Sequence, residues 1–417
     1  MPKQNLPNLD YAPAALRGPS ELGKELVNWL FPAYITLIAM SIFLFLTKQM
    51  MPLGNAMSFD RAVLTAVNAA TLTGFQQKLG PNFFKAPAQI LVLLLTLAGS
   101  LFSLIVGGLA VRRILRLRFS DGQVIRAALL AEAAALLIGA AGGCGISQSL
   151  LGGLSQGAAT FGNSGMSLGR PFGVTAWQTH AILLPMVCLG GLGITVLMEL
   201  YELLIHARPL SIHARTVLTW TFGVYVVAAA ALTLIQWIAA DWQLTQGTFT
   251  HTLAMSSVSA INSRTAGIPF DGAAVVPRSM RWAQMILMII GAAPGGTGGG
   301  LKVTTIAVIC GATRALLRRA NPGRSAGIAL CWLGMYLGIA LIGLIMLLFV
   351  EPQLAPDQVL FMTISALSNV GLSHDQLPDM PRGAFVLAAL MMAGRMVPLL
   401  VLWWMADSMN DAEIAVG

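Results

Sequence analysis

The sequence predicts an all-α polytopic membrane protein made of four pseudo-repeats, each consisting of a span, a pore loop and a second span. Three observations lead to this fold class: long uncharged apolar stretches, a short glycine-bearing segment that occurs four times, and the near-even spacing of those segments. The arrangement amounts to eight transmembrane helices and four re-entrant pore helices around a central axis.

The composition is typical of an integral membrane protein. Apolar residues make up 56% of the 417 residues and charged residues only 10%, against about 25% charged residues in a soluble domain. A helical span needs about 20 apolar residues. Five stretches reach that length without a charge, namely 26–47, 86–111, 171–198, 216–240 and 325–350, and three more contain isolated charges, namely 124–141, 282–313 and 383–405. The sequence therefore predicts eight spans.

The basic residues lie beside the spans and not on one soluble segment, so the net charge of +8 does not indicate a nucleic-acid partner. Three clusters follow spans: Arg112, Arg113, Arg116 and Arg118; Arg208 and Arg215; and Arg314, Arg318, Arg319 and Arg324. By the positive-inside rule these linkers are cytoplasmic. Both termini are then expected inside the cell, as a leader at 1–25 without a cleavable signal and a short tail at 408–417.

The repeated segment consists of a small or β-branched residue, then glycine, then a large apolar residue. The four glycines, Gly74, Gly165, Gly267 and Gly371, are 91, 102 and 104 residues apart. A stretch of roughly 14 residues, too short to span a bilayer, precedes each of them, at 58–72, 149–163, 250–264 and 357–370. Ser58 and Asp357 are the clearest predicted helix caps. Each unit is therefore predicted to be a short helix followed by a glycine turn.

A second glycine-bearing segment follows each loop glycine after roughly 23 to 28 residues, at 98–100, 190–193, 295–300 and 394–395. Two full spans separate each loop glycine from the next, so all four loops enter from one face, the one opposite the basic linkers. Such parallel repeats can surround a common axis, whereas inverted repeats need an odd number of crossings between halves. The expected repeats are 26–111, 121–205, 214–319 and 325–407.

Converging loops of this kind predict a central ion pathway. Non-helical backbone at membrane depth is tolerated where protein buries it or water bathes it, and rings of carbonyl oxygens can replace the hydration shell of a monovalent cation. Glycine allows positive φ at low steric cost, and helix C-termini add partial negative charge. No glycine segment contains Asp or Glu, which favours a monovalent cation over calcium or magnesium. Glu132 is the only obvious acid within a span, which argues against proton coupling.

The four loops, the glycine-rich run 291–302 and the pair Gly394–Arg395 resemble the Trk/Ktr/HKT superfamily of potassium transporters, over about residues 26–407. The resemblance implies a filter of backbone carbonyls that binds the transported K⁺, at Gly74, Gly165, Gly267 and Gly371 and the preceding Thr73, Ser164, Ala266 and Val370. By the same resemblance, glycine instead of serine in the first loop implies a preference for potassium over sodium.

The resemblance also implies a gate below the filter, in the loop 291–300 of the third repeat. Glycine density there independently predicts a helix interruption, with a packed glycine-rich helix face as the alternative. The gate residues are expected to be Gly295, Gly296, Thr297, Gly298, Gly299, Gly300, Lys302 and Arg395. Arg395 is expected to raise the barrier below the filter, while a structural ion pair or a snorkelling side chain is an equal alternative for Lys302.

The resemblance further implies partners and a location. The expected protein is a Ktr-like homodimer in a cell membrane, the bacterial inner membrane, with a separate cytosolic nucleotide-binding regulatory subunit (TrkA/KtrA-like). The leader at 1–25 has no room for the extra N-terminal spans of Trk-type relatives. No tightly bound organic cofactor is expected in this chain, and a nucleotide would act only through the partner.

Four alternatives stay open. Residues 162–165 match the Gly-x-Ser-Gly pattern of rhomboid-type intramembrane proteases, but such an enzyme needs a histidine base, and His180, His206, His213, His251 and His374 are expected at span ends or in loops. A coupled carrier for a larger solute conflicts with parallel repetition. A sodium-using or nonselective relative, and channel against coupled transport, are not separated by the sequence.

Overall fold

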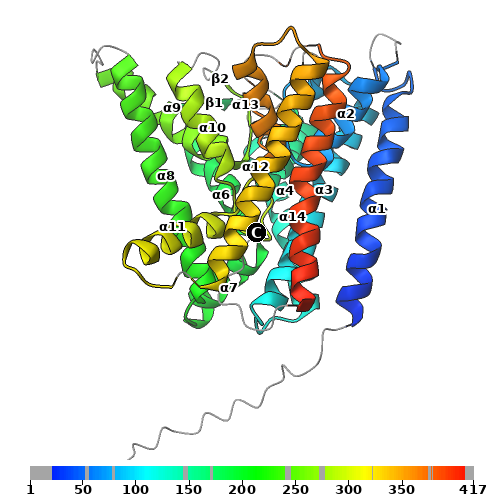
Figure 1. The fold of residues 1–417 in the computed structure, drawn as a ribbon. Helices are drawn as coiled ribbons and strands as arrows, with labels where there is room; N and C mark the ends of the chain where they lie inside the picture. Colours follow the sequence, from blue (N-terminus) through cyan, green and yellow to red (C-terminus); the bar gives the residue numbers. More distant parts are fainter. Residues whose placement is uncertain are drawn as a thin grey trace, which may run out of the picture.

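The computed structural model describes residues 21–51, 56–77, 80–143, 149–169, 172–239, 246–271, 278–321, 323–373, 377 and 379–408. Most of the leader predicted at 1–25, nearly all of the tail predicted at 408–417, and His374 lie outside the described residues. Within them the protein is predominantly helical (Figure 1).

In the part of the chain that the structure describes, six helices are long and apolar enough to cross a membrane, or seven if one bent pair counts as a single span. The six are α1 (Glu21–Phe45), α3 (Ala86–Ile114), α4 (Asp121–Gly143), α8 (Ile212–Ala239), α12 (Arg324–Val350) and α14 (Gly383–Ser408). Large apolar side chains stay exposed on these helices; Phe349 of α12, for example, is 85% exposed. Such surfaces suit contact with hydrocarbon and not with water.

The prediction of one continuous span at 171–198 is wrong. A π-helical turn, η2 (Thr179–Leu183), leads into α6 (Leu184–Leu192), and α7 (Ile194–His206) then leaves at an angle of 107°. The bend falls at Gly193, whose φ of +84° is readily adopted only by glycine. The predicted span 282–313 is also divided, because α10 (Arg278–Ile289) and α11 (Val303–Leu317) are separated by non-helical chain.

Four shorter helices precede the four glycine segments: α2 (Phe59–Ala70), α5 (Leu150–Gly162), α9 (Gln246–Thr265) and α13 (Pro356–Leu367). With 20 residues, α9 is longer than predicted. The cap at Asp357 is a wrong prediction, because Ala355 occupies the N-cap position and Pro356 begins the helix. Ser58 is the N-cap of α2 without a side-chain cap bond, whereas Ser149 accepts a hydrogen bond from the Gly152 amide.

Three of the short helices and the described chain ends lie in opposite halves of the molecule. Figure 1 shows α2, α9 and α13 in the upper half, while α1 begins and α14 ends at the lower edge. Two basic linkers meet at that lower end: Arg113 lies 4.4 Å from the ring centre of Trp403 in α14 and pairs with Asp121, and Arg118 and Arg208 both pair with Glu202.

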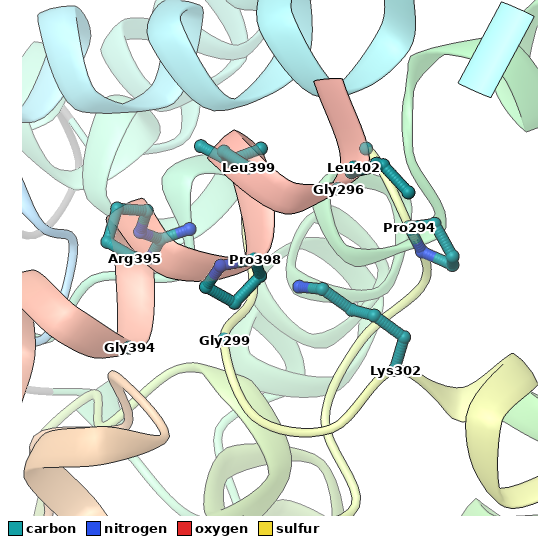
Figure 2. Close-up of a pocket in the computed structure, with 10 residues that line it drawn as sticks. Pro294, Gly296, Gly299, Lys302, Gly394, Arg395, Pro398, Leu399 and Leu402 are labelled. Atoms are coloured by element: carbon teal, nitrogen blue, oxygen red, sulfur yellow. The ribbon is translucent and has the colours of Figure 1, made fainter. Parts of the chain in front are cut away.

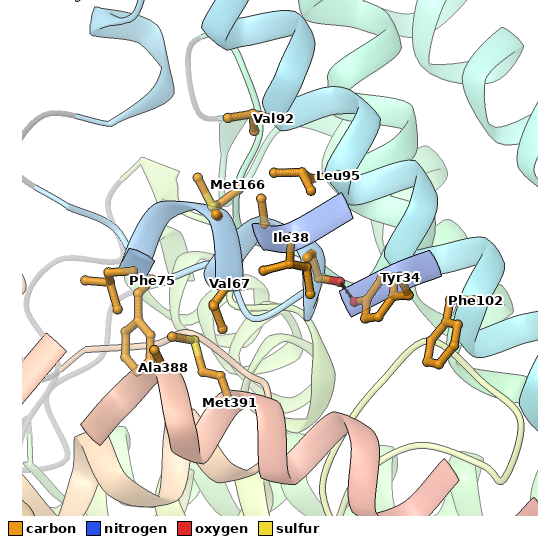
Figure 3. Packing of buried hydrophobic residues seen from close by; sticks show 14 of the residues in the cluster. Tyr34, Ile38, Val67, Phe75, Val92, Leu95, Phe102, Met166, Ala388 and Met391 are labelled. Atoms are coloured by element: carbon orange, nitrogen blue, oxygen red, sulfur yellow. Dashed lines mark hydrogen bonds between the residues drawn. The ribbon is translucent and has the colours of Figure 1, made fainter. Parts of the chain in front are cut away.

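The largest apolar core surrounds α2, which packs against α1, α3 and α14 (Figure 3). Tyr34 of α1 stacks on Phe102 of α3 with 4.3 Å between ring centres, and its hydroxyl donates to the carbonyl oxygen of Ala70 at 2.5 Å. Ala70 is the last residue of α2, and the carbonyl groups in the last turn of a helix lack intrahelical partners. Apolar packing and this hydrogen bond together fix the end of the helix beside the first glycine segment.

Short connections complete the fold. The 3₁₀ turn η1 (Pro81–Phe83) precedes α3, and the two-residue strands β1 (Phe172–Gly173) and β2 (Phe270–Asp271) pair in parallel, with Phe172 opposite Phe270. This small sheet ties the chain beyond the second glycine segment to the chain beyond the third.

Candidate functional site

The four glycine segments meet backbone to backbone, although they lie far apart in the sequence. A Cβ atom built on Gly74 would lie 2.0 Å from the amide nitrogen of Gly165. One built on Gly165 would lie 2.3 Å from the carbonyl oxygen of Gly267 and 2.6 Å from that of Gly74. No side chain fits between these three segments, so glycine is required by close approach.

The fourth segment closes the ring. A Cβ atom on Gly267 would lie 1.8 Å from the carbonyl oxygen of Val370, and one on Gly371 would lie 2.1 Å from that of Thr73. The structure thus brings together the glycines singled out in the sequence, with Thr73 and Val370 beside them. Ser164 and Ala266 are fully buried next to their glycines, and the Ser164 hydroxyl accepts a hydrogen bond from the Met166 amide.

Positive φ angles occur at two positions in the loops, at the glycine itself and two residues before it. Gly74, Gly267 and Gly371 have φ of +94°, +56° and +82°, in the region that favours glycine, whereas Gly165 does not. The expectation of positive φ at all four glycines is therefore wrong for the second loop, where glycine is needed only for space. Positive φ also occurs two residues before the glycine, at the ends of three short helices, in Leu72, Asn163 and Asn369.

The large apolar residue after the glycine anchors the first three loops, whereas Leu372 of the fourth loop is only partly buried. Phe75, Met166 and Ile268 are 2%, 3% and 4% exposed and belong to the apolar cores. Their burial holds the backbone of the loop in the ring and leaves the backbone polar groups facing the other loops.

Asparagine side chains fix the first and third loops. In the first, Asn68 of α2 accepts through Oδ1 from the amides of Gly74 (2.7 Å) and Phe75 (2.9 Å). In the third, Asn262 of α9 accepts from the amide of Ile268 and donates to its carbonyl, both at 2.8 Å. Sequence reasoning did not single out these asparagines, although both precede their glycine by five or six residues.

The second and fourth loops are fixed to the spans that follow them. Asn163 Nδ2 donates to the carbonyl of Val187 in α6 (3.1 Å), and Asn369 Nδ2 donates to that of Met391 in α14 (2.9 Å). Asn369 also donates to Thr73 Oγ1 across the ring (3.0 Å). Both asparagines stand two residues before the loop glycine, a repeated position that could have been recognised in the sequence.

The second glycine of three repeats packs on the end of the short helix. A Cβ atom on Gly99, Gly190 or Gly394 would lie 1.8 to 1.9 Å from a carbonyl oxygen, of Ala70, Phe161 and Leu367 respectively. In every case that carbonyl belongs to the residue four positions before the loop glycine. The third repeat differs, because its glycine-rich run forms the interruption between α10 and α11.

That interruption, residues 290–302, is called here the intramembrane segment. Its ends are held together, since the Gly291 amide donates to Leu301 (2.8 Å) and the Leu301 amide donates to Ile289 (3.0 Å). Its middle is attached to α6 through the amide of Thr297, which donates to the carbonyl of Gly190 (3.1 Å). The segment is therefore an ordered loop and not a glycine-rich face of a continuous helix.

Buried cations hold the intramembrane segment through its carbonyl oxygens. Arg264 of α9 donates to Gly291 (2.9 Å), Lys302 donates to Gly298 (2.8 Å), and Arg395 of α14 donates to Thr297 (2.6 Å). All three side chains are less than a tenth exposed. A buried charge is costly unless it is hydrogen-bonded, and carbonyl oxygens supply bonds here. Snorkelling does not describe Lys302 or Arg395.

Arg395 also contacts the first loop, because its Nε and Nη2 donate to the carbonyl oxygen of Thr71 at 3.0 and 2.6 Å. Figure 2 shows Arg395 on α14 and Lys302 extending from the intramembrane segment towards Pro398. The pocket between them has a volume of about 10 Å³, which is close to the minimum for one water molecule. The space beside these two cations is therefore narrow.

The chain is similar in sequence to known ion uptake proteins. No family model matches the chain. It is 27% identical over 242 residues to the Ktr system potassium uptake protein B of Vibrio alginolyticus, covering 52% of this chain and 50% of that protein. It is 25% identical over 241 residues to the potassium/sodium uptake protein NtpJ of Enterococcus hirae, covering 55% and 53%. The match thus spans about half the length of these curated relatives.

A solved structure extends the likeness to nearly the whole chain. The crystal structure of the potassium transporter TrkH from Vibrio parahaemolyticus superposes with a TM-score of 0.71 at 16% identity, covering 93% of this chain and 85% of that one. At this identity the likeness shows the fold. Together the comparisons confirm the resemblance to the Trk/Ktr superfamily. The relatives' names describe uptake and transport, so they do not support an intramembrane protease.

Proposed function

We propose that this chain, a Trk/Ktr-like membrane subunit by sequence and fold, takes up potassium ions through the ring of four glycine loops. The observation that carries the proposal is the closed backbone contact from Gly74 through Gly165 and Gly267 to Gly371 and Thr73. The close approach leaves no room for a side chain at the glycines themselves, so backbone carbonyl oxygens are the acceptors offered to an ion there.

The carbonyl oxygens of Thr73, Gly74, Gly267 and Val370 border the positions where the glycines approach one another. In the proposed filter, such oxygens take the place of water around a dehydrated monovalent cation. The four short helices end beside the loops, so their partial negative charges favour a cation near the ring. The loops contain no carboxylate that would favour a divalent ion.

We assign the gate to the intramembrane segment, with Gly295, Gly296, Thr297, Gly298, Gly299, Gly300, Lys302 and Arg395. Two features support this: the narrow pocket that both cations line, and the direct bonds of Arg395 to the first loop and to the segment. A guanidinium close to the pathway repels a passing cation. The closed pathway would open when the segment moves away.

Potassium is the proposed ion for two reasons. The names of the Vibrio alginolyticus Ktr protein and of TrkH both specify potassium, and the first loop has glycine at position 74. Sodium use is the second candidate, favoured by the potassium/sodium name of the Enterococcus relative. We also propose four repeats at 26–111, 121–205, 214–319 and 325–407, a homodimer, a separate cytosolic nucleotide-binding subunit and a location in the cell membrane with both termini in the cytoplasm.

The test is rubidium uptake into liposomes that contain the purified protein and are loaded with potassium. Potassium and caesium should compete with rubidium, sodium and lithium should compete weakly, and Gly74→Ser should erode that preference. Equal competition by sodium would assign the protein to the sodium-using alternative. Absence of uptake, together with absence of rubidium-dependent thermal stabilisation of the purified protein, would contradict the proposal.

A further inference from the structure

The side-chain amide of Gln76 bridges two loops of the ring. Its Nε2 donates to the carbonyl oxygen of Gly74 at 2.9 Å and to that of Gly165 at 2.8 Å. A primary amide has two N–H groups, so each can serve one oxygen. The opposite orientation of the amide would place Oε1 against two other oxygens, which excludes it on electrostatic grounds.

The amide nitrogen thus contacts both carbonyl oxygens at once. The chain runs from Thr71, whose carbonyl oxygen is linked through Arg395 to the intramembrane segment, past Gly74 to Gln76, which stands five residues further from that link. Gly165 O also accepts from the Ser167 amide at 3.1 Å. A carbonyl oxygen has two lone pairs, and both are thus in use while the Gln76 amide is bound.

Only the first loop carries such a side chain at this position. Two residues after the other loop glycines stand Ser167, Pro269 and Ser373, whose side chains are too short to extend to a neighbouring loop as Gln76 does. At this position the ring therefore carries one side-chain amide, and this amide joins the first and second loops.

We propose that the Gln76 amide competes with the transported cation for the outermost position of the filter, an inference that rests on the proposed function. An ion that contacts Gly74 O and Gly165 O requires the space and the lone pairs that Nε2 occupies. The side chain is only half-buried, so it can rotate outwards. The apparent affinity for the ion is then the intrinsic affinity reduced by the fraction of molecules in which the amide is displaced.

Rubidium uptake by proteoliposomes as a function of external rubidium tests this competition. Gln76→Ala should lower the half-saturating concentration about tenfold, as expected for loss of two competing hydrogen bonds. Gln76→Lys should nearly abolish uptake, because a tethered ammonium would hold the same oxygens. Gln77 is the matched control: its amide lies 3.2 Å from Thr65 Oγ1, and Gln77→Ala should leave the half-saturating concentration unchanged.

A second readout separates competition from a structural bridge. Rubidium-dependent thermal stabilisation, measured against choline in detergent, reports cation binding without transport, and Gln76→Ala should reach half of the full shift at about tenfold lower rubidium. If Gln76 only joined the loops, Gln76→Ala would lower Tm and discrimination against sodium while the half-saturating concentration stayed the same or rose, which would overturn the inference. Wild type without uptake or stabilisation would overturn the proposed function as well.

Discussion

Arg395 and Thr297 are joined by a hydrogen bond of 2.6 Å from the guanidinium Nη1 to the backbone carbonyl oxygen. The same guanidinium donates to the carbonyl of Thr71, just before the first glycine of the ring. One buried side chain thus connects the ring of loops with the intramembrane segment, at the place where the proposed filter passes into the proposed gate.

Replacing Arg395 with Ala should raise the rate of rubidium uptake. The substitution removes a positive charge from the narrow pocket and two contacts that hold the segment near the ring. We expect an increase of about three- to tenfold, which corresponds to a barrier lowered by ~0.7–1.4 kcal/mol. Arg395→Lys retains the charge and should not exceed the wild-type rate. An unchanged rate in Arg395→Ala would remove this residue from the gate.

Lys302, like Arg395, should slow rubidium uptake in the wild-type protein. Its ammonium donates to Gly298 O at 2.8 Å and lines the same pocket as Arg395. Lys302→Met, which keeps the length of the side chain, is expected to raise uptake about two- to threefold through loss of the local repulsion. Lys85→Met, at the exposed start of α3, serves as the control with no expected effect. If both variants behaved alike, Lys302 would have a structural role only.

The link between the second loop and the intramembrane segment should be measurable as stability. Asn163 Nδ2 donates to Thr297 Oγ1 at 2.7 Å, and that hydroxyl donates to the carbonyl of Phe161 at 3.0 Å. Thr297→Val keeps the shape but removes both buried hydrogen bonds of the hydroxyl, which should cost about 1–3 kcal/mol. Thr297→Ser keeps the hydroxyl and should cost less than half as much. Thermal unfolding in detergent compares them, and equal losses would contradict the hydrogen-bond account.

The glycines that abut the short helices should not tolerate a methyl group. A Cβ on Gly394 would lie 1.9 Å from Leu367 O, whereas one on Gly338, in the middle of α12, would meet nothing within 4 Å. Gly394→Ala should therefore lower Tm and reduce uptake, because α14 must move away from the end of α13. Gly338→Ala should be neutral or stabilise the helix by up to ~1 kcal/mol. Similar Tm values for the two variants would show that α14 accommodates the methyl group freely.

Much of this architecture could be predicted from the sequence because it depends on local patterns of apolar residues and glycines. Stretches of about 20 apolar residues identify spans wherever they occur, and the spacing of Gly74, Gly165, Gly267 and Gly371 identifies equivalent positions without knowledge of their contacts. The density of glycine at 291–300 likewise predicts where a helix is interrupted. The bend at Gly193 was missed because its apolar surroundings are those of a continuous span.

Only the tertiary structure decided which groups meet. The bonds of Gln76 to Gly165, of Asn163 to Thr297 and of Arg395 to Thr71 join residues 89 to 324 positions apart. Such partners depend on how the helices pack around one another, and hydropathy records burial without recording the neighbour. The sequence by itself therefore determined the spans, the repeated glycines and the resemblance, whereas packing decided which carbonyl oxygens face each other and which side chains control access to them.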